Sequence, residues 1–199
     1  FDNVRLGVPR TEAATFYIDS ATGNDSNTGL ATDQAWATLT PVNASDLLPG
    51  DRILFKAGTT YTGQLKPTDS GADGNPIVID MYGTGPKPRI DGQGLVTPTL
   101  YLYNVEYYEV SNLEITNTGA TSQAGRMGVY IHVNNFGTAH NIELKNLYIH
   151  DVNGTCRKRD GASGGIRWQT RGKVKRSRLN GFLVENCHIV RCERDGIMG

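Results

Sequence analysis

YEVSNLEI at residues 108–115 recurs as IELKNLYI at 142–149 and as FLVENCHI at 182–189. The three stretches superpose on a central asparagine, with apolar or aromatic residues four and two positions before it and one and three positions after it. Apolar residues occupy every second position on each side of the asparagine, and this alternation shifts by one residue across it. Because a flat strand cannot change face in this way, the pattern predicts two short strands joined by a tight corner.

The corner asparagines are Asn112, Asn146 and Asn186. Asparagine tolerates the left-handed backbone that a tight corner needs better than most other residues. Its side-chain amide can also hydrogen bond to an equivalent amide in the next repeat. We therefore expect the three residues to stack and to form an asparagine ladder.

A third strand precedes each corner. Similar apolar stretches recur about every 30 residues, a spacing typical of solenoid proteins. They are Leu100–Tyr103, Gly128–His132, Gly164–Gln169 and Gly196–Gly199. No stretch sustains the 3.6-residue period of an amphipathic helix, and 24 glycines with 38% apolar residues suit short strands and turns. The sequence predicts an all-β protein, a right-handed parallel β-helix with three strands per coil.

The chain is expected to form a single domain over residues 1–199, with residues 1–50 as the N-terminal region and cap and 51–199 as the coils. A short helix within 36–48 would protect the open end of the solenoid. Because Gly199 follows the start of a new strand, we expect the chain to be a portion of a longer solenoid whose C-terminal coils are missing.

The charge is balanced overall, with 20 basic and 20 acidic residues, which excludes a generally cationic nucleic-acid binder. The distribution is uneven, however. Residues 157–178 contain nine cations and one acid, a net charge of +8, whereas the rest of the chain carries −8. This basic block indicates an anionic ligand.

Several motifs resemble those of right-handed β-helix proteins of the pectate-lyase-like superfamily. They include GNDSNTG at 23–29, LPGDRI at 48–53, GNPIVID at 74–80, VSNLEITNTG at 110–119 and LYIHDVNG at 147–154. The chain looks most like alginate lyases of polysaccharide lyase family 31. The resemblance implies β-elimination without a metal, by a Lys or Tyr pair with an Arg nearby.

Alternation within the third strand places the candidate site. Tyr130 and Arg167 are expected to point outward from neighbouring coils, about 4.8 Å apart along the axis. The loop 153–163 enters this sheet and the loop 170–179 leaves it, and both carry cations of the basic block. We expect the loops to bracket the strand and to form a cationic groove for a polyanion.

Elimination from a uronan needs a base for the C5 proton, an acid for the leaving O4 and a cation for the carboxylate. Lys158 is the candidate base, because the neighbouring arginines lower its pKa, and Tyr130 is the candidate acid. Arginine binds carboxylate in a bidentate manner. Residues expected to bind substrate are Arg157, Arg167, Arg176, Arg178 and His150. His150, which precedes Asp151, has a structural role at its turn as the alternative.

Two other functions remain open. A glycoside hydrolase on the same scaffold would need a carboxylate pair about 5 to 9.5 Å apart, drawn from Asp151, Asp160, Glu193 and Asp195. A non-catalytic β-helix that binds anionic glycan is the third hypothesis. We expect no metal and no cofactor. Calcium is not favoured, because no dense oxygen-ligand motif is present and the surrounding cations would repel it.

The expected partner is an acidic polysaccharide substrate, with no nucleic acid and no membrane. No apolar run approaches the roughly 20 residues that span a bilayer. Cys156, Cys187 and Cys192 match no zinc pattern, and we expect them to be small buried side chains. The protein is expected to be a secreted or periplasmic monomer, associated at most with the missing C-terminal segment.

Overall fold

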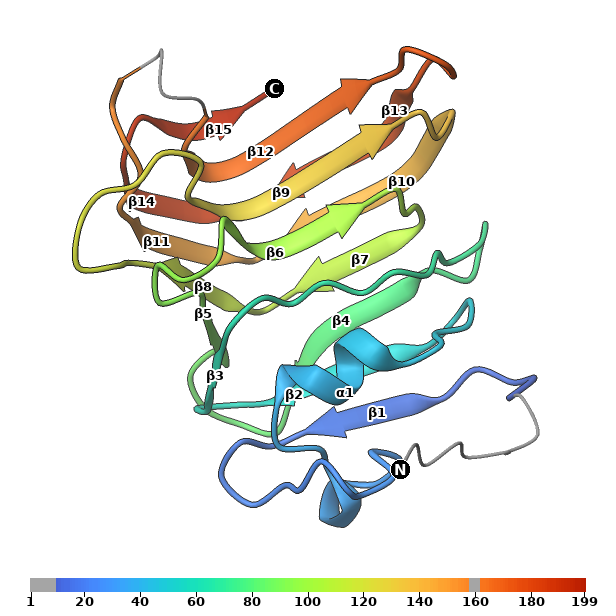
Figure 1. The fold of residues 1–199 in the computed structure, drawn as a ribbon. Coiled ribbons are helices and arrows are strands. Elements are labelled where there is room, and N and C mark those ends of the chain that lie inside the picture. Colours follow the sequence, from blue (N-terminus) through green and yellow to red (C-terminus); the bar gives the residue numbers. More distant parts are fainter. Residues whose placement is uncertain (1–9, 158–161) are drawn as a thin grey trace, which may run out of the picture.

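The computed structural model describes residues 10–157 and 162–199, and over these ranges the chain winds as a right-handed parallel β-helix. Figure 1 shows the coils stacked from β1 at the N-terminal end to β15 at the C-terminal end. The predicted fold class is confirmed. The structure does not test whether residues 1–199 form a single domain, and that expectation stays a prediction.

Three parallel sheets run along the axis of the solenoid, and each coil after the first adds one strand to two or all three of them. Sheet A contains β1 (Thr15–Ile18), β2 (Arg52–Lys56), β4 (Ile77–Tyr82), β7 (Tyr108–Ser111), β10 (Thr138–Lys145) and β13 (Arg178–Glu185). Sheet B contains β3 (Thr60–Thr62), β5 (Arg89–Asp91), β8 (Glu114–Asn117), β11 (Tyr148–Val152) and β14 (His188–Cys192). Sheet C contains β6 (Pro98–Tyr103), β9 (Met127–Asn134), β12 (Gly164–Arg171) and β15 (Asp195–Met198).

The corner between sheets A and B has the predicted left-handed backbone, with φ of 57° at Asn112, 52° at Asn146 and 51° at Asn186. The Asn146 amide donates to Oδ1 of Asn112 at 2.6 Å, and the Asn112 amide donates to Oδ1 of Asp80 at 2.7 Å. A ladder therefore joins these coils, and an aspartate occupies its N-terminal end.

The core fills the space between the three sheets. The apolar residues that flank each corner lie in register from coil to coil, as Val110 does with Leu144 and Ile115 with Ile149. All four are fully buried. The one-residue shift at the asparagine thus turns both strands toward the same interior.

A short helix lies beside the first coils. Helix α1 (Leu39–Ala44) follows a 3₁₀ turn, η1 (Thr32–Gln34), and begins at Thr38, whose hydroxyl accepts a hydrogen bond from the Thr40 amide at 3.2 Å. It buries Leu39 and Val42 in the core. Figure 1 shows α1 next to β1 and β2, in the part of the solenoid that precedes the first strand of sheet C. The predicted N-terminal helix is confirmed.

Two further features bear on the predictions. The three-residue strand β3 was not predicted. Within the described ranges, no helix is long and apolar enough to cross a membrane, and all three cysteines are free. Cys156 is exposed and Cys187 and Cys192 are half-buried, contrary to the prediction that all three are buried apolar side chains.

Replacing Asn146 tests the corner. In Asn146→Ala the ladder hydrogen bond is lost, and alanine must adopt the left-handed backbone conformation, which its β-carbon disfavours. We therefore expect the free energy of unfolding to fall by about 2 kcal/mol. In Asn146→Gly the backbone strain is absent, and about half of that loss should be recovered. Urea unfolding followed by circular dichroism measures both, and equal stability of the two variants would contradict a backbone constraint.

Candidate functional site

The outer face of sheet C carries the largest group of aromatic and hydrogen-bonding side chains near the predicted site. Parallel pairing places Tyr101 on β6, Tyr130 on β9, Arg167 on β12 and Met198 on β15 at one register position. The predicted neighbourhood of Tyr130 and Arg167 is therefore present. These residues form the first column of the face.

Two tyrosine rings stack in this column, and a cation lies over each of them. The rings of Tyr101 and Tyr130 lie 5.4 Å apart between centroids and are nearly parallel, at 7°. Cζ of Arg167 lies 5.2 Å from the Tyr130 centroid, and Nζ of Lys66 lies 5.5 Å from the Tyr101 centroid. The ring faces are thus turned toward each other and toward the cations. Their edges and hydroxyl groups are left for hydrogen bonding.

A second column lies two residues further along each strand and contains Tyr103, His132 and Gln169. It is hydrogen bonded to the first column. The Tyr130 hydroxyl donates to Oε1 of Gln169 at 2.7 Å, and the Tyr101 hydroxyl lies 3.2 Å from Nδ1 of His132. Tyr103 packs its ring 5.2 Å from the His132 ring and is 36% exposed. Together the two columns define what we call the sheet C face.

The sheet C face has neutral polar groups at its centre. Burial raises the pKa of Tyr130, although Arg167 and Arg171 oppose this. Burial, followed by the charges of Arg171 and Arg167, lowers the pKa of His132. At neutral pH the phenol and the imidazole are consequently both uncharged, and each can donate or accept a hydrogen bond.

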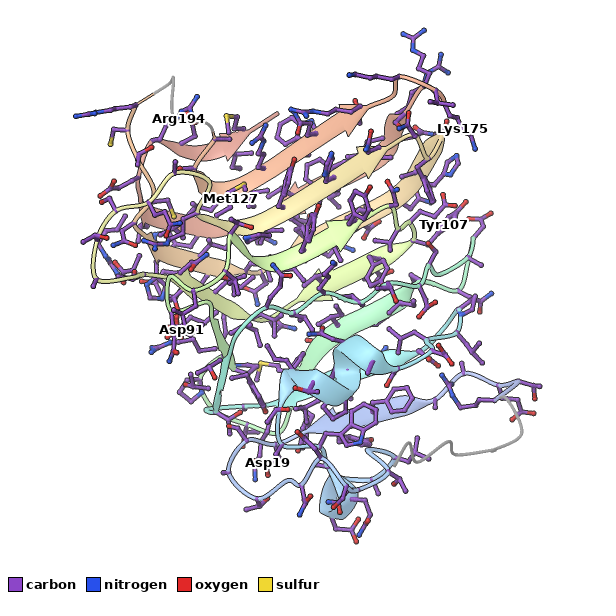
Figure 2. The ribbon with its side chains drawn as sticks, in the orientation of Figure 1. Asp19, Asp91, Tyr107, Met127, Lys175 and Arg194 are labelled. Atoms are coloured by element: carbon purple, nitrogen blue, oxygen red, sulfur yellow. The ribbon has the colours of Figure 1, made fainter. Side chains whose placement is uncertain are left out.

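The predicted arginines lie at opposite ends of β12. Arg157 is exposed in the segment before this strand, whereas Arg176 follows it and Arg178 begins β13. Eight extended residues span about 25 Å. In Figure 2, the labelled residues Arg194 and Lys175 mark these two ends. The structure therefore does not bring Arg157 together with Arg176 and Arg178 around one sugar unit.

Two of the predicted residues cannot be placed. Lys158, the candidate base, and Asp160, one of the candidate carboxylates, lie outside the described residues.

His150 lies on sheet B, away from Tyr130. It is buried, and its Nε2 lies 2.9 Å from Oε1 of Glu114 while its Nδ1 lies 2.7 Å from Oδ2 of Asp151. Both ring nitrogens thus have carboxylate partners within the protein. This arrangement matches the structural alternative for His150 and leaves it apart from the sheet C face.

The candidate carboxylates are also dispersed. Two hydrogen bonds from Arg191, at 2.6 and 2.9 Å, and one with His150 lower the pKa of Asp151 well below its usual range. Glu193 precedes β15 and contacts the Ser122 hydroxyl at 3.3 Å, while Asp195 begins β15. Among the outward residues that make up the two described columns, none is a carboxylate. A hydrolytic acid pair is therefore not formed by these columns.

A cleft of about 790 Å³ lies beside the loop that follows β12. Arg171, Arg176 and Arg178 contribute to it, but so do Trp168 and Leu179, which face the interior and pack against the core. The cleft is thus continuous with the interior of the solenoid, and Gln169 of the sheet C face also lines it. No group of three His, Cys, Asp or Glu residues suited to a metal occurs in the described ranges.

The proteins to which this chain is similar are glycoside hydrolases. The lacto-N-biosidase of Bifidobacterium longum subsp. longum is 34% identical over 209 aligned residues, which cover 78% of this chain and 13% of that protein. The crystal structure of GH136 lacto-N-biosidase from Eubacterium ramulus matches with a TM-score of 0.81 and 30% identity, over 93% of this chain and 36% of that chain. Its selenomethionine derivative gives a TM-score of 0.82. No model of a known protein family matches the chain.

These similarities correct the functional prediction. The assignment to alginate lyases of polysaccharide lyase family 31, and with it uronan cleavage by β-elimination, is wrong, because the relatives at 30–34% identity are hydrolases. The motifs that suggested a lyase include the corner repeat and its turns, which belong to the scaffold. Unrelated chemistries share such scaffolds. The glycoside hydrolase alternative is the better supported hypothesis.

Sequence reasoning missed part of the sheet C face. Tyr101, Tyr103, His132 and Gln169 belong to the predicted third strands but were not predicted as site residues. The available signal was the repetition of aromatic residues at alternating positions, YLY at 101–103 and YIH at 130–132, in consecutive coils.

A titration of His132 tests the electrostatics of this face. Because the charge of Arg171 contributes to the lowered pKa of His132, Arg171→Gln should raise that pKa. The value should stay below the ordinary 6.5, because burial is the larger cause. Imidazole proton chemical shifts measured by NMR against pH give the result. Arg52→Gln, on sheet A, is the control and should leave the His132 titration unchanged.

Proposed function

We propose that this chain belongs to a glycoside hydrolase that acts on an oligosaccharide containing lacto-N-biose, and that its sheet C face contacts the sugar. The observation that supports this proposal is the 34% identity to one lacto-N-biosidase, together with a TM-score of 0.81 to a second. The chain spans 13% and 36% of the lengths of these proteins, so the activity of the whole protein is part of the proposal.

The chemistry of the sheet C face supports an uncharged saccharide. Its central groups include a phenol and an amide, which match the hydroxyl and amide groups of a neutral sugar, and an imidazole whose Nδ1 is paired with the Tyr101 hydroxyl and whose Nε2 is buried. Arg167 of the first column and the neighbouring Lys66 lie over tyrosine rings. Cations engaged in this way stabilise the face, and a neutral ligand does not require them to bind a carboxylate.

Glycoside hydrolysis by the usual route uses two carboxyl groups, an acid that protonates the leaving oxygen and a second that acts as base or nucleophile. The described columns of the sheet C face contain neither. We therefore assign these columns to binding and orientation. Tyr130 holds Gln169 in place through its hydroxyl, and the Gln169 amide nitrogen can donate to a sugar hydroxyl.

The proposal is tested with the nitrophenyl glycoside of lacto-N-biose. We expect release of nitrophenol and of the intact disaccharide, identified by chromatography. Alginate and polygalacturonate serve as comparison substrates and should yield no unsaturated, ultraviolet-absorbing ends. Unsaturated products from either uronan, or the absence of disaccharide release, would overturn the proposed function.

Tyr130→Phe tests the assigned binding role. Losing the hydrogen bond to Gln169 should lower kcat/KM by about tenfold, mainly through KM, because Gln169 is no longer fixed. The matched control is Tyr148→Phe, which removes a hydroxyl from sheet B and should change kcat/KM less than twofold. A similar loss in both variants would point to stability instead of binding.

A further inference from the structure

The proposed hydrolase does not account for the densest group of cations in the described chain. Residues 171–178, with the sequence RGKVKRSR, connect β12 to β13 and are called the basic loop below. The cations are Arg171, Lys173, Lys175, Arg176 and Arg178, and the loop contains no acid. Figure 2 shows the labelled Lys175 at one end of the sheets, among other side chains that extend from the molecule.

The five cationic side chains have no anionic partner among the residues that the structure describes. Across residues 10–157 and 162–199, no carboxylate forms an ion pair with any of them. Arg126, in contrast, is buried and donates to several backbone carbonyls. Concentrating like charges disfavours the folded state through self-repulsion. An anionic ligand would relieve that repulsion.

The basic loop is fixed by hydrogen bonds to the preceding coil. Oδ1 of Asn135 accepts from the backbone amides of Val174 and Lys175, at 2.9 and 3.3 Å, and the Ser177 hydroxyl oxygen accepts from the Phe136 amide at 3.1 Å. A β-carbon at Gly172 would lie 2.2 Å from the Lys175 carbonyl oxygen, so this tight turn requires glycine. The backbone is thereby organised before any ligand binds, which lowers the entropic cost of binding.

We propose that the basic loop binds a polyanionic polysaccharide, without cleaving it. A linear polymer with regularly spaced sulfate or carboxylate groups can contact several of the five cations at once. The neighbouring sheet C face adds phenol and amide groups that suit the sugar hydroxyls between the charges. Arg171 connects the two surfaces, because it ends β12 in register with Asn134 of β9.

The same observations disfavour other polyanions. Proteins that bind single-stranded nucleic acid stack bases on exposed aromatic faces. In the first column of the sheet C face, the ring faces of Tyr101 and Tyr130 are covered by each other and by cations. For an anionic membrane, Val174 is 92% exposed at the centre of the basic loop but is its only apolar side chain, too little to insert into a bilayer.

The test measures binding of the purified protein to heparin, a sulfated probe, and to polygalacturonate, a carboxylated one. In Lys173→Gln/Lys175→Gln, we expect the affinity for at least one of them to fall tenfold or more, since each lysine near an anionic surface contributes about fivefold in affinity and two together about 25-fold. The matched control, Arg52→Gln/Arg89→Gln, removes the same charge from exposed positions outside the basic loop and should change affinity less than twofold. Circular dichroism checks that both variants are folded.

Three outcomes would overturn the inference. They are no binding of the wild-type protein to either polysaccharide, equal losses in the two double variants, and equal or tighter binding to single-stranded DNA or to anionic phospholipid vesicles. Which probe binds more tightly distinguishes sulfate from carboxylate. Disaccharide release is a separate measurement, so the proposed hydrolase and the basic-loop site can fail independently.

Discussion

The left-handed corner at Asn112, Asn146 and Asn186 is the constraint on which the other features depend. It turns the chain between sheets A and B while keeping the apolar residues on both sides in the core. Because the corner recurs at the same place in each coil, the strands stack in register. That register also aligns the outward side chains of sheet C, although the corner is on another edge of the solenoid. A one-residue slip would exchange inner and outer residues on a whole strand.

The dependence on register explains how much could be predicted from the sequence. Alternation and repeat spacing predict which residues face outward and which are neighbours on adjacent coils, so Tyr130 and Arg167 were placed together. They do not predict side-chain rotamers. Whether a guanidinium points to solvent or lies over a ring depends on local packing, and Arg167 is positioned over Tyr130. The predicted carboxylate clamp assumed the first arrangement, and the structure shows the second.

Proximity in sequence was the weaker guide. Arg157 and Arg176 belong to one basic block, but a full strand of sheet C separates them, and the block divides into groups at the two ends of β12. The same limitation applies to the acids considered for hydrolysis. Asp151 is close to the block in sequence, yet it lies on sheet B with Arg191 and His150. Because the chain keeps one direction along a strand, the residues before and after that strand lie a strand length apart.

The incorrect prediction of a polysaccharide lyase has a related cause. Repeats, corner asparagines and turn motifs are requirements of the β-helix, and they constrain the chemistry of its outer face very little. Cations near a tyrosine suggested elimination from a uronan, because that reaction needs all of these groups. In the folded chain they serve separate purposes. Lys66 and Arg167 lie over the rings of two tyrosines, whose hydroxyls hydrogen bond with an imidazole and an amide, while five cations gather in the basic loop. The separation gives one surface suited to neutral sugar hydroxyls and another suited to anionic groups, and only the first matches the substrate type of the hydrolases that this chain resembles.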